Sequence, residues 1–299
     1  MLKNTVVIAG PASLDLAKSI SKNLNVKFIE TELKLFADGE SKIRIPPIDK
    51  KHCIIVQSLY PPIDRHIIQL FMIIHKCKRD NASKITVIIP YMAYARQDKI
   101  FLEGEIISIS LLAELIQNCG TTEIITVDIH NEQSLSYFSI TIKNISAIPI
   151  LAEYLKNNKT IDIEKSIIVS PDEGGKKRAE KIAELLKLQI LCLKKKRDRK
   201  TGLVSVKENL GLVVEGKDAI LIDDMISTGG SIVKACEVLK KNKIRNIIVL
   251  CTHAIFLDNA FEKIMNTGVK EIISTNSIPN ICAKVDLAPI LSNVVVNTN

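Results

Sequence analysis

The chain has 299 residues, 46% of them hydrophobic and none of them tryptophan, and this length favours two domains of similar size over a single core. Its formal net charge of +8 suits polyanionic ligands, while sparse aromatic residues and the lack of zinc-finger or RNA-binding motifs disfavour nucleic acid as a partner. Seven cysteines without a CxxC pair argue against a disulfide framework and against cysteine-bound metal, and they indicate a reducing compartment.

The opening segment predicts a strand at residues 5–9 and not a signal peptide, because its apolar core is short and a Gly-Pro turn follows. No stretch of the sequence approaches the ~18 apolar residues that a membrane-spanning helix needs. We therefore expect a cytoplasmic protein that has no membrane partner.

Strand and helix patterns alternate along the whole sequence. In the first half, strands are predicted at residues 5–9, 26–30, 53–57, 84–89 and 123–127, with helices at 13–23, 64–78 and 108–117. In the second half, strands are predicted at 166–169, 189–193, 218–222 and 246–251, with helices at 176–186, 232–241 and 258–265. A late apolar segment at 294–296 could add a strand to one of the sheets. This alternation is typical of α/β proteins, so we expect two doubly wound parallel-sheet domains, residues 1–147 and 148–299.

The strand at residues 218–222 leads into the stretch that carries most of the chemistry. Asp223 and Asp224 end the strand, and a loop of hydroxyl and glycine residues follows: Ser227, Thr228, Gly229, Gly230 and Ser231. Glycine lets a ligand approach the backbone, and amides at a helix N-terminus favour phosphate. The two carboxylates suit sugar hydroxyls or Mg²⁺. The stretch therefore predicts a sugar-phosphate site, with a tight turn and solvated acids as the structural alternative.

Other chemically distinctive segments also follow predicted strands. They are PYMAYARQDK (90–99), DIHNEQ (128–133), SPDEGG (170–175) and LKKKR (193–197). Ligands of open parallel sheets bind beyond the carboxyl ends of the strands. Together with the stretch after the strand at 218–222, these four segments make five strand ends, which indicate one composite site.

Three of these segments offer candidate ligands, each with a structural alternative. Arg96 suits a phosphate, and Gln97 and Asp98 suit a base edge, unless the segment is a solvated loop. His130 could ligate Mg²⁺ or meet a phosphate, although a lone histidine is usually structural. Asp172 could hold a metal-bound diphosphate or cap the following helix.

Two further segments allow more than one interpretation. The basic run at 194–200 suits either a solvated face or a loop that closes over phosphates. FADGE at 36–40 combines Phe36 with Asp38 and Glu40, which suits stacking on adenine and hydrogen bonding to it. From these five residues alone, a simple turn with a buried phenylalanine is the preferred interpretation.

Taken in order, FADGE, YARQDK, TVDIHNEQ, VSPDEGG, the Lys-x-Arg within LKKKR and LIDDMISTGGS resemble the motifs of the phosphoribosyl diphosphate (PRPP) synthetases, also called ribose-phosphate pyrophosphokinases. The resemblance extends over residues 5–279, whereas phosphoribosyltransferases share only the last motif. It implies two phosphoribosyltransferase-type domains, the second with the ribose 5-phosphate loop. It also implies a transferase of nucleotide biosynthesis that moves the β,γ-diphosphate of MgATP to the 1-hydroxyl of ribose 5-phosphate and leaves AMP.

The resemblance implies a role for each matching residue on the ATP side. Phe36, Asp38 and Glu40 would contact adenine from a neighbouring subunit, and Arg96, Gln97 and Asp98 would complete the ATP site. His130 and Asp172 would bind the Mg²⁺–triphosphate, with Mg²⁺ as the cofactor.

Roles on the ribose side follow in the same way. Asp223 and Asp224 would hold the ribose hydroxyls, and the loop from Ser227 through Thr228, Gly229 and Gly230 to Ser231 would hold the 5-phosphate. Lys195 and Arg197 would stabilise the transition state as catalytic residues, with Lys194-x-Lys196 as an alternative register.

The sequence departs from the family pattern at two places, the first in the phosphate loop and the second in a segment that bears on ADP regulation and on the assembly. Ser227 stands where many members carry an acid, and the segment IFLEGEIISIS is more like the archaeal branch than the ADP-regulated bacterial and mammalian enzymes. We expect a homo-oligomer, which could be a dimer, a tetramer or a hexamer. Two alternative functions stay open: a phosphoribosyltransferase that consumes PRPP, and a non-catalytic synthetase-associated subunit. No GxxxxGK[ST] motif of a P-loop ATPase is present.

Overall fold

The computed structural model of this chain describes residues 2, 4–158, 161–193, 195–197, 204–206 and 214–297, and for 195–197 and 204–206 it describes the backbone alone. The chain forms two compact units. The first unit comprises Met1–Ser146, Ser277–Pro279 and Asp286–Asn299, and the second comprises Ala147–Asn276 and Asn280–Val285. Among the described helices, none is long and apolar enough to cross a membrane.

The first unit is built on a six-stranded parallel sheet with the order β2-β1-β5-β6-β7-β8. The strands are β1 (Thr5–Ala9), β2 (Lys27–Glu30), β5 (His52–Val56), β6 (Lys84–Ile89), β7 (Glu123–Val127) and β8 (Thr141–Ile145). Strands β1, β5 and β7 are buried along their whole length, as expected for a parallel sheet that helices cover on both faces. The sequence predicted all of these strands except β8.

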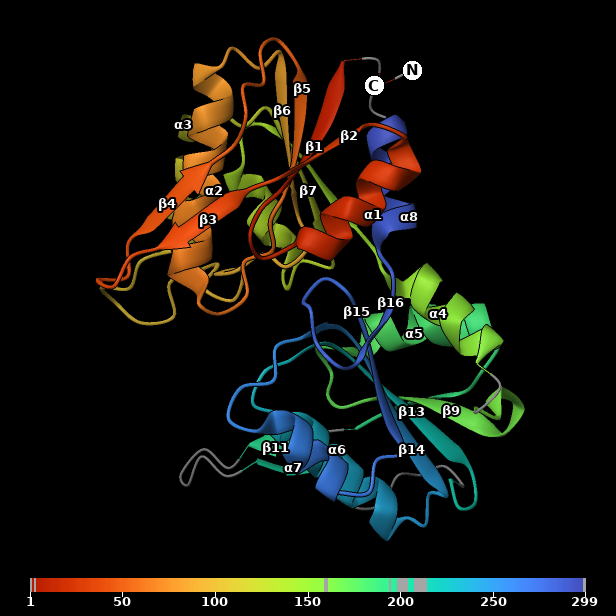
Figure 1. Cartoon of the computed structure of the whole chain (residues 1–299). Helices are drawn as coiled ribbons and strands as arrows, with labels where there is room; N and C mark the ends of the chain where they lie inside the picture. Colours follow the sequence, from red (N-terminus) through yellow and green to blue (C-terminus); the bar gives the residue numbers. More distant parts are fainter. Residues whose placement is uncertain are drawn as a thin grey trace. The chain divides into compact units, whose positions relative to one another are not determined.

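Helices cover both faces of this sheet (Figure 1). Helices α1 (Leu14–Leu24) and α8 (Ala288–Val296) lie on one face, and α2 (Ile63–Arg79) and α3 (Ser108–Cys119) lie on the other. A short 3₁₀ helix, η1 (Glu132–Tyr137), connects β7 to β8. Helices α1, α2 and α3 alternate with the strands of the sheet in chain order up to β7, and α8 returns from the end of the sequence.

The apolar segment at 294–296 belongs to helix α8, so the expectation that it adds a strand is wrong. The buried residues of α8 include Ala288, Leu291 and Val295, which recur at helical spacing and form one apolar stripe. This helix packs against α1, so residues 286–299 belong to the first compact unit, whereas the sequence placed them in the second domain. Ser277 is also part of the first unit, where its carbonyl accepts a 2.6 Å hydrogen bond from Ser58 Oγ.

A two-stranded antiparallel hairpin lies outside the first sheet and was not predicted. It consists of β3 (Glu32–Leu35) and β4 (Ser41–Arg44), with Leu35 opposite Ser41 at the turn. Every residue of β3 is exposed, although its sequence ELKL alternates polar and apolar residues in the way that is typical of a half-buried strand. The FADGE segment forms the tip of this hairpin.

The second unit repeats the architecture with the order β10-β9-β13-β14-β15-β16, and all neighbours are parallel. The strands are β9 (Ser166–Ser170), β10 (Ile190–Cys192), β13 (Asp218–Ile226), β14 (Asn246–Ala254), β15 (Glu271–Thr275) and β16 (Ala283–Val285). The helices are α4 (Ile148–Asn157), α5 (Lys176–Leu186), α6 (Gly230–Lys241) and α7 (Ala260–Asn266), with a 3₁₀ turn η2 (Ile163–Lys165) before β9. A separate antiparallel pair joins β11 (Lys195–Arg197) and β12 (Val204–Val206).

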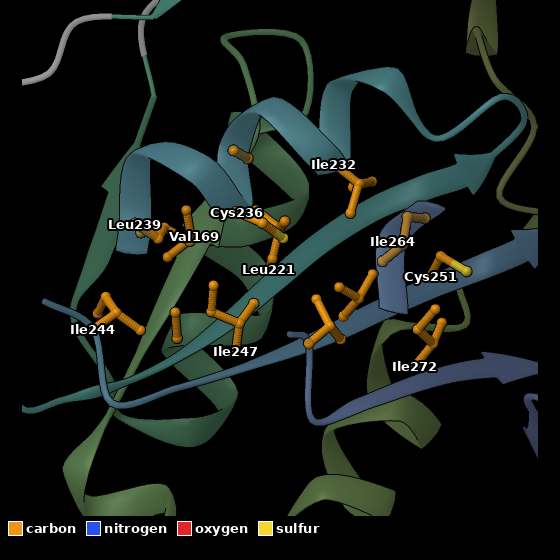
Figure 2. Close-up of a cluster of buried hydrophobic side chains, with 14 of the residues drawn as sticks. Val169, Leu221, Ile232, Cys236, Leu239, Ile244, Ile247, Cys251, Ile264 and Ile272 are labelled. Atoms are coloured by element: carbon orange, nitrogen blue, oxygen red, sulfur yellow. The ribbon is translucent and has the colours of Figure 1, made fainter. Parts of the chain in front are cut away.

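An apolar core fixes α6 and α7 on one face of this sheet (Figure 2). Val169, Leu221 and Cys251 come from β9, β13 and β14, and they meet Cys236 of α6 and Ile264 of α7. Alternate residues of a strand share a face, so the same strands present Ile168, Ile220 and Ile222 to the opposite side, where they are also fully buried. This packing holds the start of α6 at the carboxyl end of β13.

Candidate active site

Asp223 and Asp224 lie inside β13 and not at its end, which corrects the sequence interpretation. The strand continues to Ile226 because β14 continues beside it, pairing Asp223 with Cys251 and Ile226 with Ala254. The side chains of Asp223 and Asp224 are 20% and 8% exposed. Both acids are therefore held on a rigid, hydrogen-bonded element near the carboxyl edge of the sheet.

The loop after β13 is shaped by Gly229. This residue has φ +76, a left-handed conformation that favours glycine, and it precedes the first turn of α6. A Cβ at Gly229 would lie 3.1 Å from Ile264 Cδ1, whereas a Cβ at Gly230 would meet nothing within 4 Å. The loop is thus packed on its inner side and open at Gly230.

The start of α6 has the properties of an anion site. Within the described residues, the first turn of α6 contains no acidic residue, and no side chain caps the helix. Helix N-termini carry partial positive charge and attract phosphate. The neighbouring loop is fixed by backbone bonds, because the Leu257 amide donates to the Ser227 carbonyl at 3.0 Å and the Phe256 amide donates to the Ile226 carbonyl at 3.1 Å.

Arg178 of α5 lies beside the acidic pair. Its Nη1 atom is 3.9 Å from Asp223 Oδ1, and its Nη2 atom is 3.7 Å from Asp224 Oδ2. Burial, followed by repulsion from the Asp224 carboxylate, raises the pKa of Asp223, and the Arg178 charge opposes this rise. The sequence interpretation did not single out this arginine.

Asp172 makes hydrogen bonds within its own loop. Its Oδ1 atom accepts a 3.2 Å hydrogen bond from the amide of Gly175, the residue before α5. Its carbonyl accepts hydrogen bonds from Ser170 Oγ at 2.7 Å and from Cys192 Sγ at 3.3 Å. The loop 171–175 is therefore well ordered by its own bonds, and it follows β9, the neighbour of β13 in the sheet.

In the first unit, two segments that follow adjacent strands meet through Asn131. Its Nδ2 atom donates to Asp98 Oδ2, and its Oδ1 atom accepts a 3.0 Å bond from the Gln133 amide. Tyr137 Oη donates to the Asp98 carbonyl at 2.8 Å. Because β6 and β7 are neighbours, the segments after them reach the same edge of the sheet, as the sequence predicted.

The remaining candidates on these segments differ in exposure. Arg96 and His130 are exposed, Asp98 is buried, and Gln97 Nε2 donates to Glu105 Oε2 at 3.3 Å. Tyr94 and Asp128 have φ values of 61 and 38, which are uncommon for residues other than glycine. Such conformations are concentrated at functional sites.

Phe36 is 40% exposed at the tip of the β3–β4 hairpin, so the interpretation as a buried phenylalanine in a turn is wrong. The turn itself is present, since the Phe36 amide donates to the Glu40 carbonyl at 2.9 Å and Asp38 Oδ1 accepts a 3.0 Å bond from the Glu40 amide. Asp38 and Glu40 are exposed.

Lys195 and Arg197 lie on β11, opposite Val206 and Val204 of β12. Their side chains fall outside the described part of the structure, as does the whole of Lys194. Their assignment as catalytic residues therefore stays a prediction.

The segments after β6, β7, β9 and β13 lie at the carboxyl edges of the two sheets, whereas Phe36, Asp38 and Glu40 lie on the separate β3–β4 hairpin. Three residues that contact the candidates were not among the predicted site residues: Asn131, Tyr137 and Arg178. Asn131 follows His130 directly, and Arg178 follows SPDEGG by three positions, so proximity to a motif was the available signal. Within the described residues, no three His, Cys, Asp or Glu side chains gather as a metal cluster.

Comparison with known proteins gives a consistent result over the whole chain. Residues 5–120 match the N-terminal domain of ribose phosphate pyrophosphokinase, and residues 203–295 match the phosphoribosyl synthetase-associated domain. The ribose-phosphate pyrophosphokinase of Sulfurisphaera tokodaii is 39% identical over 291 residues, covering 96% of this chain and 99% of the relative. That of Methanobrevibacter smithii is 38% identical over 298 residues, covering 97% and 99%. The crystal structure of phosphoribosylpyrophosphate synthetase from Mycobacterium smegmatis superposes with a TM-score of 0.87 at 30% identity, covering 99% of this chain and 98% of that one.

Proposed function

The chain belongs to the ribose-phosphate pyrophosphokinase family, and from this premise we propose that it is an enzyme that transfers the diphosphate of MgATP to the 1-hydroxyl of ribose 5-phosphate, giving PRPP and AMP. The observation that carries the proposal within the structure is the carboxyl-terminal part of β13 with the loop that follows it. There, two carboxylates precede an open glycine loop and a helix start that has no acidic residue in its first turn. This is the chemistry that a phosphorylated sugar requires at its two ends.

We assign the ribose 5-phosphate to the second unit. Asp223 and Asp224 accept hydrogen bonds from the ribose hydroxyls, because carboxylates accept from hydroxyl donors and repel phosphate. The loop residues Ser227, Thr228, Gly229, Gly230 and Ser231 donate to the 5-phosphate through hydroxyls and amides. The openness at Gly230 supports this assignment, since a ligand could approach the backbone there.

We assign ATP to the segments after β6 and β7. Exposed Arg96 pairs with phosphate oxygens, Gln97 completes the site, and Asp98 is held in place by Asn131. His130, also exposed, meets the triphosphate. The exposed Phe36, with Asp38 and Glu40, is available to contact the adenine of a neighbouring subunit.

Mg²⁺ enters as part of the substrate MgATP. Protein sites for Mg²⁺ generally use one or two side chains together with substrate phosphates, so a three-ligand protein cluster is not required. The Asp172 carboxylate matches the preference of Mg²⁺ for oxygen, and His130 contributes either a ligand or a hydrogen bond to a phosphate oxygen. When bound, the ion neutralises charge on the phosphate oxygens.

The reaction needs alignment and charge stabilisation more than it needs a nucleophilic side chain. The attacking group is the 1-hydroxyl of the sugar, and the leaving group is AMP. We propose that Lys195 and Arg197 provide positive charge to the diphosphate as it moves between the two, which is the largest contribution expected from side chains here.

The test is formation of AMP and PRPP by the purified chain from Mg²⁺, ATP and ribose 5-phosphate, with each component omitted in turn and with a D223N/D224N double variant as the inactive control. A phosphoribosyltransferase would form no AMP from this mixture. A regulatory subunit would bind ATP but form no product. Either result would overturn the proposal.

We also propose that the chain self-associates through the first unit. One part of this unit exposes apolar side chains on the hairpin, α2 and α3: Leu33, Leu35, Phe36, Ile68, Met72, Leu111 and Leu115, each at least 37% exposed. Helix α2 contacts both β4 and α3, so these elements are continuous. Exposed apolar patches of this kind mark interaction sites.

Light scattering after size-exclusion chromatography tests the assembly. An I68D/M72D variant should shift the mass towards the monomer, and I281D should not, because Ile281 is 81% exposed but lies in the second unit. A monomeric wild-type chain would contradict the proposal.

A further inference from the structure

We propose that Arg178 is a positioning residue for the ribose hydroxyls: its guanidinium lies within ion-pair distance of both Asp223 and Asp224 and holds their carboxyl groups in place to accept hydrogen bonds. The inference rests on the proposed function, since it takes the two acids as the ribose-binding pair. It adds Arg178 to the site as a residue that contacts the two acids and not the substrate.

The geometry requires a forked cation. Asp223 and Asp224 are successive residues of β13, and their carboxyl groups lie close enough to repel each other and to share a side-chain hydrogen bond. One guanidinium reaches both, with Nη1 3.9 Å from Asp223 Oδ1 and Nη2 3.7 Å from Asp224 Oδ2. A guanidinium presents separate donors in a fixed plane, whereas a lysine ammonium is a single point charge.

The two separations are longer than an N–H···O hydrogen bond, which spans about 2.7–3.2 Å. Arg178 therefore attracts both carboxylates without forming hydrogen bonds to these two oxygens. Each carboxylate offers roughly four lone-pair sites. The backbone amides of Asp224 and Met225 each donate to one of these sites, on Asp223 Oδ1 and Asp224 Oδ1 respectively, which anchors both carboxyl groups to the strand.

The charges around the acids explain why a cation is needed there. Burial and the neighbouring Asp224 carboxylate raise the pKa of Asp223 to about 8, and the Arg178 charge limits this rise. Across the sheet, Cys251 of β14 faces the pair, but burial and the two carboxylates raise the pKa of its thiol well above the usual value, so it stays neutral. Among the described residues, Arg178 is the cation identified as acting on Asp223.

The position of Arg178 on α5 is unfavourable for the isolated helix. Lys176, Lys177 and Arg178 form its first turn, with no acidic residue among them. Positive charge at a helix N-terminus opposes the helix macrodipole, so a compensating interaction is expected. The side chain of Arg178 is only 18% exposed and points at the acids of β13, which provide that compensation.

Gly175 leaves room for the Ser170 hydroxyl, beside which the Arg178 guanidinium lies. Its φ is −84, which any residue adopts, so its conformation does not explain the glycine. A Cβ at this position would lie 2.8 Å from Ser170 Oγ and 3.9 Å from Arg178 Nη1. The space that a side chain would fill is therefore used by the groups that line the end of β9.

The experiment compares Arg178→Met and Arg178→Lys with Lys181→Gln, an exposed cation of the same helix. In Arg178→Met, we expect the KM for ribose 5-phosphate to rise about tenfold or more while kcat changes less, because binding of the sugar is weakened first. Arg178→Lys should recover part of the loss, and Lys181→Gln should match the wild type. An unchanged KM in folded Arg178→Met would overturn the inference.

A second readout does not depend on turnover. Carbon-13 NMR of aspartate carboxyl groups, assigned with Asp223→Asn, measures the pKa of Asp223 without substrate. Removal of a cation at this distance should raise the pKa of Asp223 by about 1 unit or more in Arg178→Met. If Arg178→Met does not fold, Arg178→Lys provides the same comparison, with a smaller expected rise. If the wild type makes no PRPP, the proposed function fails, but this titration still decides the role of Arg178. An unmoved pKa in both variants rejects it.

Discussion

Asn131, on the segment after β7, donates a hydrogen bond through Nδ2 to Oδ2 of Asp98, on the segment after β6. The same side chain accepts a bond from the Gln133 amide, so one amide group connects two segments and starts the 3₁₀ helix η1. Asp98 is buried, and a buried carboxylate needs such donors. The contact fixes the geometry of the residues to which we assign ATP.

Replacing Asn131 should therefore weaken ATP binding. Asn131→Ala removes both bonds, whereas Asn131→Asp keeps the acceptor for the Gln133 amide and places a second negative charge beside Asp98. We expect the KM for ATP to rise in both variants, by roughly tenfold for each ~1.4 kcal/mol lost, and to rise more in Asn131→Asp. Steady-state kinetics with ribose 5-phosphate held saturating provide the measurement. A larger effect in Asn131→Ala would contradict the electrostatic explanation.

Replacing Lys195 or Arg197 should lower the turnover number. Loss of one well-placed transition-state donor costs ~10²–10³ in rate, so Lys195→Ala and Arg197→Ala should each lose most of kcat. Ribose 5-phosphate is assigned to other residues, so its dissociation constant from calorimetry should stay near the wild-type value. Lys194→Ala serves as the matched control from the same basic run. Near-normal turnover in Lys195→Ala together with a large loss in Lys194→Ala would move the assignment to the alternative register.

Gly229 and Gly230 should respond differently to alanine. Gly229→Ala adds a Cβ 3.1 Å from Ile264 Cδ1 at a φ of +76, and a left-handed residue other than glycine costs about 1–2 kcal/mol, so the melting temperature should fall. Gly230→Ala adds a Cβ in open space at the start of a helix, where glycine-to-alanine changes stabilise by about 0.4–1 kcal/mol. Calorimetric melting curves compare the two variants.

The same pair tests the phosphate loop. If the 5-phosphate approaches the backbone at Gly230, Gly230→Ala should raise the KM for ribose 5-phosphate even though it does not lower stability. Unchanged kinetics in Gly230→Ala would place the phosphate elsewhere.

His52 should make stability depend on pH. Burial and the positive charge of Lys84 lower the pKa of His52 from 6.5 to about 4, while the negative charge of Glu123 opposes this shift. The Nε2 atom of His52 lies 2.8 Å from Thr86 Oγ1. The unfolded chain takes up a proton below pH 6.5 that the folded chain does not bind until about pH 4. Stability from this group is therefore complete above pH 6.5 and falls between pH 6.5 and 4, by up to about 3 kcal/mol.

Urea unfolding at several pH values measures this loss. His52→Gln removes the titrating ring, so its free energy of unfolding should fall less between pH 7 and pH 5 than that of the wild type. His75→Gln is the control, because His75 is an exposed residue of α2. Equal slopes for wild type and His52→Gln would contradict the expected role of His52.

Several elements were predictable because their residues repeat a simple pattern. Strands β1, β6 and β7 match the predicted ranges, and α5 matches from Lys176 to Leu186. Each of these strands is a short apolar run that the parallel sheet buries, and α5 places Ala179, Ile182, Ala183 and Leu186 on one face. Local sequence and final environment agree in these segments, so pattern alone was sufficient.

Other elements depended on packing between distant segments. Residues 294–296 are three consecutive valines, which favour a strand by propensity, but Leu291 and Val295 pack against α1 and the segment is helical. Likewise, the acids of β13 do not end the strand, because β14 provides backbone partners up to Ala254. Neither partner is visible from the local sequence.

The sequence by itself determined the chemistry: which side chains follow the strands, in which order, and therefore the family to which the chain belongs. The tertiary structure decided which of them touch. Asn131 meets Asp98 because β6 and β7 are neighbours, and Arg178 reaches Asp223 and Asp224 because α5 begins beside the end of β13. Hydrogen bonds and ion pairs act over a few ångströms, so such contacts arise from the placement of whole elements and not from the spacing of residues along the chain.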